Sequence, residues 1–290
     1  MKKIVIFGVG LIGGSVALAL KKAGSTAQIV GVGRSSKSLQ AALDLGVIDT
    51  ATSDIAAAVT DADIILIAAP VAQTPSILNA IKPHLAASTV ITDAGSTKGD
   101  VLQCAQGILG KQFSQFVGGH PIAGAEKSGV SAAMADLYIN KNVVLTPTAE
   151  TDPQAIQRVK ALWQHCGANV SEMSAATHDG IFAAVSHLPH LLAFALVDDI
   201  ASRPNAEQLF SFAASGFRDF TRIAGSHPEM WRDISLANKT ALLNEIEAYQ
   251  QELKKLHKLL EAEDAKGLEA LFERASIARN GWGESRKNNQ

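Results

Sequence analysis

Apolar residues in the first 173 positions of this chain follow two alternating patterns. Short runs rich in β-branched residues are typical of buried strands, and they are separated by stretches whose apolar residues recur at helical spacing. The expected strands are Lys3–Phe7, Gln28–Val32, Ile64–Ala68, Thr89–Thr92, Phe116–Gly118, Val143–Thr146 and Asn169–Glu172. The expected helices include Ser38–Leu45, Thr74–Ile81 and Pro153–Cys166. Strands that alternate with helices predict a doubly wound, mostly parallel sheet.

The strand pattern stops after Met173. From Ser174 to about Arg279 nearly all of the sequence has helical periodicity, including Ala241–Leu260. We therefore expect an N-terminal α/β domain, residues 1–173, followed by an all-α domain, residues 174–290. A helical domain too elongated to close on itself would bury its apolar faces against a second copy, so we expect a homodimer.

A glycine-rich turn joins the first expected strand to a helical pattern. Gly8, Gly10 and Gly13 form GxGxxG, in which the first glycine permits a tight turn, the second allows a close backbone approach and the third lets helix and strand pack closely. The free N–H groups at the helix start, at Leu11 and Ile12, would then face a pyrophosphate. This predicts a Rossmann-type dinucleotide-binding domain; the alternative is a glycine-rich turn without a ligand.

The second expected strand ends in Gly33-Arg34-Ser35-Ser36, where an NAD-specific site usually has an acidic residue for the ribose 2′-OH. Arg34 could pair with a 2′-phosphate, and the hydroxyls of Ser35 and Ser36 could donate to it. We therefore expect NADP as the cofactor, with NAD possible. Arg34 could also be an ordinary surface arginine. Ala69 and Pro70 follow the third expected strand and are further cofactor-binding candidates.

Charge and composition narrow the class of protein. The net charge of −2 and the pI near 6.4 give no basic surface for nucleic acid or for an anionic membrane. Two histidines and a proline interrupt the apolar stretch Ile181–Val197, so we expect a buried helix rather than a membrane span. There is no signal-peptide pattern, and Cys104 and Cys166 lack metal spacing, so we expect a cytoplasmic protein with reduced thiols.

His120 and Ser96 are the candidate catalytic residues. His120 is expected just after a strand, among glycines and a proline, on the cofactor side of the sheet. A hydride can leave an alcohol carbon only if the hydroxyl proton is taken, and imidazole is suited to that near neutral pH. Ser96, after the neighbouring strand, could orient the same hydroxyl. The alternatives are a loop histidine with backbone partners and a serine that caps a helix.

A second polar cluster lies on an otherwise apolar helix. At 100° per residue, Asp179, Ser186 and His190 fall on one stripe, with His187 beside it. Buried polar groups need partners or a polar ligand, so Ser186, His187 and His190 are candidate substrate-binding residues. The spacing does not support a metal site. Pro189 is expected to kink the helix.

A third segment, residues 216–231, carries Arg218 and Arg222. A guanidinium group binds a carboxylate through two parallel hydrogen bonds, so an arginine here could anchor an acidic substrate. The alternative is surface ion pairing, which we prefer for Arg218.

Five motifs in this order, GxGLIGGS, DAGSTKGDV, GGHPIAGAEKSGV, SHLPH and TRIAGSHPEMW, resemble the prephenate/arogenate dehydrogenase family of tyrosine biosynthesis. The resemblance runs from Lys3 to about Asn238. It implies that His120 accepts the proton of the ring hydroxyl with help from Ser96, that Arg222 binds the substrate carboxylate and that His190 contacts the substrate side chain. It also implies that His178 and Asp179 lie near the mouth of the site and that Trp231, a candidate substrate-binding residue, lies near the dimer partner's pocket.

The resemblance implies oxidative decarboxylation of prephenate to 4-hydroxyphenylpyruvate, with arogenate as a possible second substrate. His190 resembles enzymes that accept prephenate, so strict arogenate use is the alternative within the family. We expect a single-function form without a chorismate mutase or a regulatory domain, in which tyrosine could inhibit only by competing in the active site. A β-hydroxyacid dehydrogenase would typically need a lysine between Ser174 and Asp199, where this chain has none. A non-catalytic NADP-sensing protein could lose the acid–base residues, which are present here.

Overall fold

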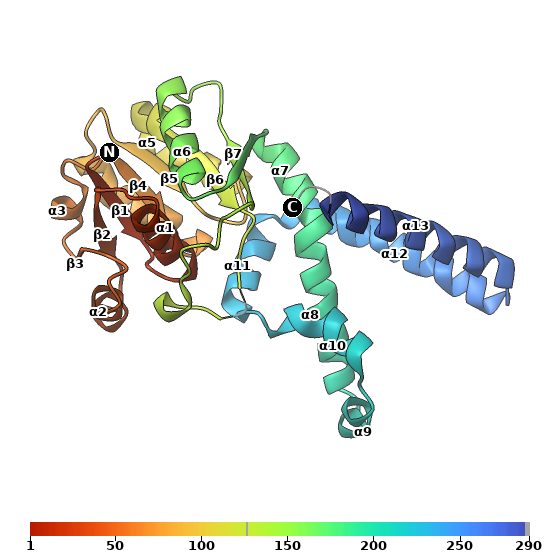
Figure 1. The fold of residues 1–290 in the computed structure, drawn as a ribbon. Helices are drawn as coiled ribbons and strands as arrows, with labels where there is room; N and C mark the ends of the chain where they lie inside the picture. Colours follow the sequence, from red (N-terminus) through yellow and green to blue (C-terminus); the bar gives the residue numbers. More distant parts are fainter. Residues whose placement is uncertain (126, 288–290) are drawn as a thin grey trace. The chain divides into compact units, whose positions relative to one another are not determined.

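The computed structural model describes residues 1–125 and 127–287 (Figure 1). Glu126, in the GGHPIAGAEKSGV motif, and residues 288–290, at the end of the expected helical domain, lie outside the described residues. Packing divides the chain into two compact units, Met1–Lys239 and Thr240–Gln290. The expected domain boundary at residue 173 stays a prediction.

The first unit contains an eight-stranded sheet with the order β3-β2-β1-β4-β5-β6-β7-β8. Its strands are β1 (Lys3–Phe7), β2 (Gln28–Val32), β3 (Thr50–Thr52), β4 (Ile64–Ile67), β5 (Val90–Asp93), β6 (Phe116–Pro121), β7 (Asn142–Thr146) and β8 (Asn169–Glu172). All neighbouring strands are parallel except β6 and β7. This confirms the predicted mostly parallel sheet, and its order reverses between β1 and β4, where doubly wound folds bind their ligands.

Helices cover both faces of the sheet because consecutive strand residues point to opposite sides. On β1, Ile4 and Ile6 belong to one apolar core and Val5 and Phe7 to the other. The first core contains residues of α1 (Leu11–Lys22), α2 (Ser36–Asp44) and α6 (Pro153–His165). The second contains residues of α3 (Ile55–Val59), α4 (Thr74–Ile81) and α5 (Gly99–Leu109).

Strand β6 is longer than the sequence predicted, and it contains His120 rather than preceding it. Phe116 and Val117 pair with β5, whereas residues 118–121 pair with β7, and His120 lies opposite Val144. The glycines at 118 and 119 predicted the end of the strand. In the structure, Gly119 lies so close to β5 that a Cβ there would come within 2.8 Å of the Asp93 carbonyl oxygen. The glycines therefore permit close strand packing, and the strand holds His120 rigidly.

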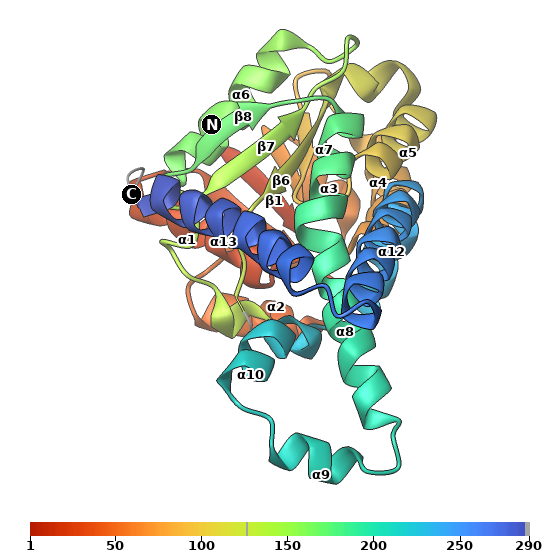
Figure 2. The ribbon, with the colours of Figure 1, turned by 90° about the vertical axis from the view of Figure 1, so that its right-hand side faces the viewer.

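A long helix follows the sheet (Figure 2). It consists of α7 (Ala175–Phe182), a π-helical turn (Ala183–His187) and α8 (Leu188–Ala201). The sequence predicted a kink at Pro189, and the structure has the π turn directly before it. A proline lacks the N–H for the preceding turn and its ring crowds that turn, and a π turn relieves both problems.

This long helix is less buried than the sequence predicted. The span Ala175–Ala201 is apolar and long enough to cross a membrane by length and composition, with a mean hydropathy of 1.8, and 28% of that window is buried. Such a test is weak evidence for a membrane span. The expectation of a buried helix is wrong for a single chain, since Val185 is 67% exposed. Periodicity shows that a helix has an apolar face but not whether the same chain covers it.

The remaining elements of the first unit are short. They include α9 (Ala206–Ser211), α10 (Ser215–Thr221), the 3-10 turns η1 (Val71–Gln73), η4 (Val130–Ala132) and η6 (Arg222–Gly225), and α11 (Pro228–Ala237). The second unit is a hairpin of α12 (Lys239–Glu261) and α13 (Ala265–Lys287). Several large apolar side chains on the hairpin are exposed, among them Leu260, Phe272 and Ile277.

Substitution of Gly13 tests how closely α1 must approach β1. A Cβ on Gly13 would collide with the carbonyl oxygen of Gly8 and come within 2.7 Å of Ile6 Cγ2. Gly13→Ala should lower the free energy of unfolding by about 1–3 kcal/mol, as overpacking typically does. Gly107→Ala is the matched control: it lies in α5 with open space around its Cβ position, so it should be neutral or stabilising by up to about 1 kcal/mol. Denaturant unfolding measures both, and an equal response would contradict the close packing.

Candidate active site

The glycine turn forms a cradle at the carboxyl end of β1. Gly8 has a positive φ of 92°, and a Cβ there would lie 2.7 Å from the Ala68 carbonyl oxygen, so glycine is required. No atom lies within 4 Å of the Cβ position of Gly10, so the backbone is open to a ligand at that point. These residues fit a dinucleotide pyrophosphate, because the middle glycine leaves the approach free.

The start of α1 is suited to an anion. Gly10 is the N-cap and no side chain caps the helix, and no acidic residue lies in the first turn. The first amides of a helix have no partner within it, so the N–H groups of Leu11 and Ile12 are available to a phosphate. Tyr138 packs beside this turn and its hydroxyl donates to the Ile12 carbonyl oxygen at 2.7 Å, which holds the turn in place. Ala69 and Pro70 lie between β4 and η1.

The turn after β2 contains the residues that predicted NADP, but the hydroxyl of Ser35 already accepts a hydrogen bond as a helix cap. Arg34 is exposed, and Gly33 is half-buried. Ser35 is the N-cap of α2, where its Oγ accepts a hydrogen bond from the Ser38 amide at 3.2 Å. Ser36 is the first residue of that helix. The cap is a structural role that the sequence analysis did not assign to Ser35.

Asp93 and Lys98 form a buried ion pair at the end of β5. The Lys98 ammonium contacts Asp93 Oδ2, and both side chains are at most 2% exposed. The same carboxylate accepts hydrogen bonds from the amides of Gly95, at 2.8 Å, and Gly119, at 3.0 Å. Asp93 therefore fixes β6 and the loop containing Ser96 to the end of β5. A buried pair with this many partners costs less than two separate buried charges.

The N-terminus of α5 is capped by Asp179, which lies about eighty residues further along the chain. Its Oδ1 accepts from the Lys98 amide at 2.9 Å, and its Oδ2 accepts from the Gly99 amide at 2.8 Å. No residue next to the helix supplies a side-chain cap. The alternative role of Ser96 as a helix cap is therefore wrong, whereas its role beside the substrate hydroxyl stays a prediction.

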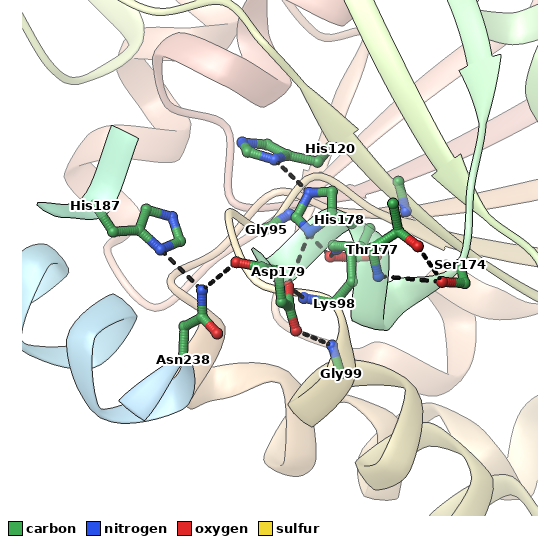
Figure 3. A network of polar contacts seen from close by, with 12 residues as sticks. Gly95, Lys98, Gly99, His120, Ser174, Thr177, His178, Asp179, His187 and Asn238 are labelled. Atoms are coloured by element: carbon green, nitrogen blue, oxygen red, sulfur yellow. Dashed lines mark hydrogen bonds and ion pairs between the residues drawn. The ribbon is translucent and has the colours of Figure 1, made fainter. Parts of the chain in front are cut away.

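Asp179 also begins a chain of hydrogen bonds that ends at His120 (Figure 3). Asp179 Oδ1 lies 2.8 Å from His178 Nδ1, and His178 Nε2 lies 2.8 Å from His120 Nδ1. His178 is fully buried, and Phe182 packs against both imidazole rings. His178 and Asp179 therefore hold His120, and their expected position near the mouth of the site stays a prediction.

The hydrogen bonds from Asp179 through His178 determine which nitrogen of His120 is free. A carboxylate only accepts, so a singly protonated His178 has its proton on Nδ1 and accepts at Nε2. His120 must then donate from Nδ1, which leaves the lone pair of its Nε2 available. A free imidazole nitrogen on a strand beside the cofactor cradle can take a proton from a substrate hydroxyl.

Burial and neighbouring groups shift the pKa values of this cluster. Burial, with His178, Lys98 and His187 nearby, holds the pKa of His120 well below its usual value. Burial alone would raise the pKa of Asp179, but hydrogen bonds from His178 and the Gly99 and Lys98 amides lower it overall. His120 is thus neutral, and Asp179 is ionised, near neutral pH.

The π turn changes which residues face inward. An ideal α-helix predicted a stripe of Asp179, Ser186 and His190, but the extra residue in the π turn brings His187 inward instead. His187 is 1% exposed, whereas Ser186 is half-buried and contributes its carbonyl oxygen, 2.9 Å from His190 Nδ1. A direct role of the Ser186 side chain in substrate binding stays a prediction.

His190, Trp231 and Arg222 lie close to one another. The rings of His190 and Trp231 stack with their centres 3.6 Å apart, and Trp231 is 7% exposed. Burial lowers the pKa of His190, the hydrogen bond to Ser186 opposes this, and the charge of Arg222 lowers it further. Trp231 therefore contacts His190, a candidate substrate-binding residue of its own chain. Its expected position near the pocket of a dimer partner stays a prediction.

Two residues of the site, Asp93 and Lys98, were given no role in it from the sequence. Both stand in the DAGSTKGDV motif, and their order after a strand was the available signal. His178 and Asp179 were expected near the site, but their contacts with the α5 amides and His120 depend on long-range packing. No group of three or more metal-ligating side chains occurs among the described residues, and the sequence predicted no metal.

Two family models match the chain. Residues 16–172 match the model described as "Prephenate dehydrogenase, nucleotide-binding domain", and residues 174–274 match "Prephenate dehydrogenase, dimerization domain". Together they cover most of the chain in the order that the motifs predicted.

Individual relatives agree. The chain is 42% identical to a prephenate dehydrogenase of Bacillus subtilis over 96% of this chain and 75% of that protein. It is 35% identical to a cyclohexadienyl dehydrogenase of Zymomonas mobilis over 96% of this chain and 95% of that one. A crystal structure of prephenate dehydrogenase from A. aeolicus in complex with hydroxyphenyl propionate and NAD⁺ has a TM-score of 0.91 and 40% identity, covering 97% of this chain and 98% of that one.

The histidine pKa values can be tested without any substrate. The ring protons of His120 should titrate with a midpoint below 6.5, and those of His187 near 4, because burial disfavours the imidazolium form. NMR titration of the full chain gives both midpoints, with signals assigned through His120→Asn and His187→Gln. A midpoint for His120 at or above 6.5 would contradict the buried, neutral base.

Proposed function

The chain belongs to the prephenate dehydrogenase family, and from that premise we propose that it converts prephenate to 4-hydroxyphenylpyruvate and CO₂ with hydride transfer to a nicotinamide cofactor. The observation that carries this proposal is the chain from Asp179 through His178 to His120, at the sheet edge that also holds the glycine cradle. It supplies the one group that the reaction needs from the protein, a positioned proton acceptor.

His120 would act on the hydroxyl of the substrate ring. A bound nicotinamide supplies the hydride acceptor for the carbon that carries this hydroxyl. As the hydride leaves, the hydroxyl proton moves to His120 Nε2 and a carbonyl group forms. Loss of CO₂ then returns an electron pair to the ring, which becomes aromatic, and His120 can return its proton to the oxygen.

The surroundings of His120 favour its neutral form at rest, and the hydrogen bonds through His178 to Asp179 can share the charge once His120 takes the proton. In the resting state burial and the Lys98 charge keep His120 neutral, so the lone pair is available. Once His120 is protonated, its Nδ1–H bond to His178 strengthens, and the Asp179 carboxylate stabilises the positive charge through His178. Asp179 is itself held by two helix amides, so it need not move.

The substrate's acidic groups would bind on the helical side of the site. We propose that Arg222 binds the ring carboxylate and that His190, stacked on Trp231, contacts the side chain. We favour prephenate, with arogenate as a second substrate, and a relative named cyclohexadienyl dehydrogenase supports the broader range. Tyrosine, which resembles the product, would compete for this site.

We propose a homodimer formed through the helical segments, because one of them matches a model described as a dimerization domain and exposes large apolar side chains. We also propose NADP as the preferred cofactor. Arg34 and the lack of an acid at residues 33–36 support this, while the A. aeolicus relative was solved with NAD⁺.

The activity is tested with prephenate and arogenate, each with NAD⁺ and NADP⁺, on wild type and His120→Asn. Wild type should reduce the cofactor with prephenate, and His120→Asn should lower kcat by about 10²–10⁴ because the proton acceptor is lost. Cofactor affinity, measured by fluorescence titration, should stay nearly unchanged. Turnover of neither substrate by the wild type would overturn the proposed function, and near-normal turnover by His120→Asn would overturn the role of His120.

The cofactor proposal is tested with Arg34→Ala. Loss of a charged hydrogen bond to the 2′-phosphate should weaken NADP⁺ binding by about 1.5–3 kcal/mol and leave NAD⁺ binding unchanged. Lys37→Ala is a matched control, since it removes an exposed charge three positions further along the same segment. Equal losses for both cofactors, or a wild-type preference for NAD⁺, would show that Arg34 does not select NADP⁺.

The carboxylate anchor is tested with Arg222→Ala. Arg222 would bind the ground state and the transition state alike until CO₂ leaves, so its loss should raise KM more than it lowers kcat, for prephenate and arogenate equally. His190→Val should instead weaken prephenate more than arogenate, because these substrates differ in the side chain. If KM for prephenate is unchanged in Arg222→Ala, the anchor lies elsewhere, and Arg218 is the next residue to test.

A further inference from the structure

Asn238, at the end of α11, makes two hydrogen bonds inside the site, and no role follows for it from the sequence motifs. It is 5% exposed. Its Nδ2 donates to the Asp179 carbonyl oxygen at 2.8 Å and lies 3.1 Å from His187 Nδ1 (Figure 3). We propose that Asn238 is a positioning residue: it holds His187 as the tautomer with its proton on Nε2, so that this nitrogen donates a hydrogen bond to an oxygen of the substrate.

The donor–acceptor pattern fixes the tautomer. The Asp179 carbonyl oxygen can only accept, so the Asn238 amide must present its NH₂ group there. The second hydrogen of the same NH₂ group points to His187 Nδ1, which therefore accepts. Burial lowers the pKa of His187 to about 4, opposed by Asp179 and aided by His178 and His190, so the ring is neutral at pH 7. Its single proton is then on Nε2.

This Nε2–H group is buried and has no hydrogen-bond partner among the described residues. A buried donor without an acceptor costs about 1–3 kcal/mol, and such a group in a binding site commonly meets its partner when the ligand binds. The Nε1–H group of Trp231 is in the same state, and the two rings lie 6.0 Å apart between centres. Two unpaired donors side by side favour an acceptor ligand, such as a carboxylate or a keto oxygen.

The position of His187 shows where that oxygen would lie. His187 is close enough to interact electrostatically with His120, His178, Asp179 and His190. It is therefore near both the proposed proton acceptor and the residue proposed for the substrate side chain. Both proposed substrates carry carboxylate oxygens, and neither the donor geometry nor the tautomer depends on which of them binds.

The tautomer can be measured without substrate, so this step stands apart from the proposed function. Long-range ¹H–¹⁵N correlation spectra of the ¹⁵N-labelled full chain at pH 7 distinguish protonated from unprotonated ring nitrogens, and His187→Gln identifies the His187 signals. Wild type should show an unprotonated Nδ1 and a protonated Nε2. In Asn238→Asp, an isosteric residue that only accepts, the proton should move to Nδ1. A wild-type ring protonated at Nδ1, or no change in Asn238→Asp, would overturn the proposal.

The role in binding rests on the proposed function and is tested by a double-mutant cycle in KM for prephenate. His187→Leu should raise KM about tenfold or more, as expected for a lost hydrogen bond to a charged group, with a smaller change in kcat. His187→Gln places an amide NH₂ near the position of Nε2 and should restore much of the affinity. Asn238→Ala should raise KM in the wild type and have little further effect in His187→Leu, because it acts through His187.

Ser235→Ala is the matched control. Ser235 lies on the same helix, is half-buried and donates to the Trp231 carbonyl oxygen at 2.7 Å without touching His187. It should leave the His187 spectrum unchanged. Additive effects of Asn238→Ala and His187→Leu, or a KM unchanged in His187→Leu, would overturn the binding role. If the wild type turns over neither substrate, the proposed function fails, while the spectra still decide the tautomer.

Discussion

The site depends on one carboxylate, that of Asp179. It accepts hydrogen bonds from two amides at the start of α5 and from His178, and its backbone carbonyl accepts from Asn238. Without it, three buried or half-buried donors would lose their acceptor, at a cost of up to about 1–3 kcal/mol each. The positive end of the α5 dipole and the two amides also keep Asp179 ionised at neutral pH. A carboxylate held in this way can orient a histidine without moving, which is the condition for a positioned base.

The sheet brings the other parts to this carboxylate. Asp93 ends β5 and is neutralised by the buried Lys98, while its second oxygen holds Gly119 of β6. The residue after Gly119 is His120, so the buried ion pair sets the position of this imidazole from the strand side, and His178 sets it from the helix side. Directly after α7, the π turn places His187 inward, and Asn238 links His187 back to Asp179. Asp179 thus holds both histidines in place. Its carboxylate acts on His120 through His178, and its backbone carbonyl oxygen acts on His187 through Asn238.

Much of this arrangement could be predicted from the sequence, for local reasons. The glycine turn, the strand–helix alternation and the placing of His120 near a strand end follow from short-range patterns, which is why Asn169–Glu172 and Thr74–Ile81 match the observed elements. Three features could not be predicted. The extension of β6 past Gly118 depends on pairing with β7, the π turn shifts Ser186 away from the predicted stripe, and the cap of α5 comes from a distant helix. The first and third depend on long-range contacts, whereas a periodicity reports only neighbours along the chain. The second is local, but a prediction at 100° per residue assumes an unbroken α-helix. The exposure of Val185 follows the same rule, since a periodicity does not show whether the same chain covers an apolar face.

We infer that Asp179 acts on the reaction through His178 and His120, and not only as a helix cap. The most direct test is the single-turnover rate of cofactor reduction in Asp179→Asn, measured together with cofactor affinity and the free energy of unfolding. Loss of the cap should cost about 1 kcal/mol of stability, as other N-caps do. The rate at saturating substrate should fall by about 10² or more while cofactor affinity is nearly unchanged, because His120 loses its orientation and the stabilisation of its charge. A loss of stability with an unchanged rate would contradict it and would leave Asp179 as a cap alone.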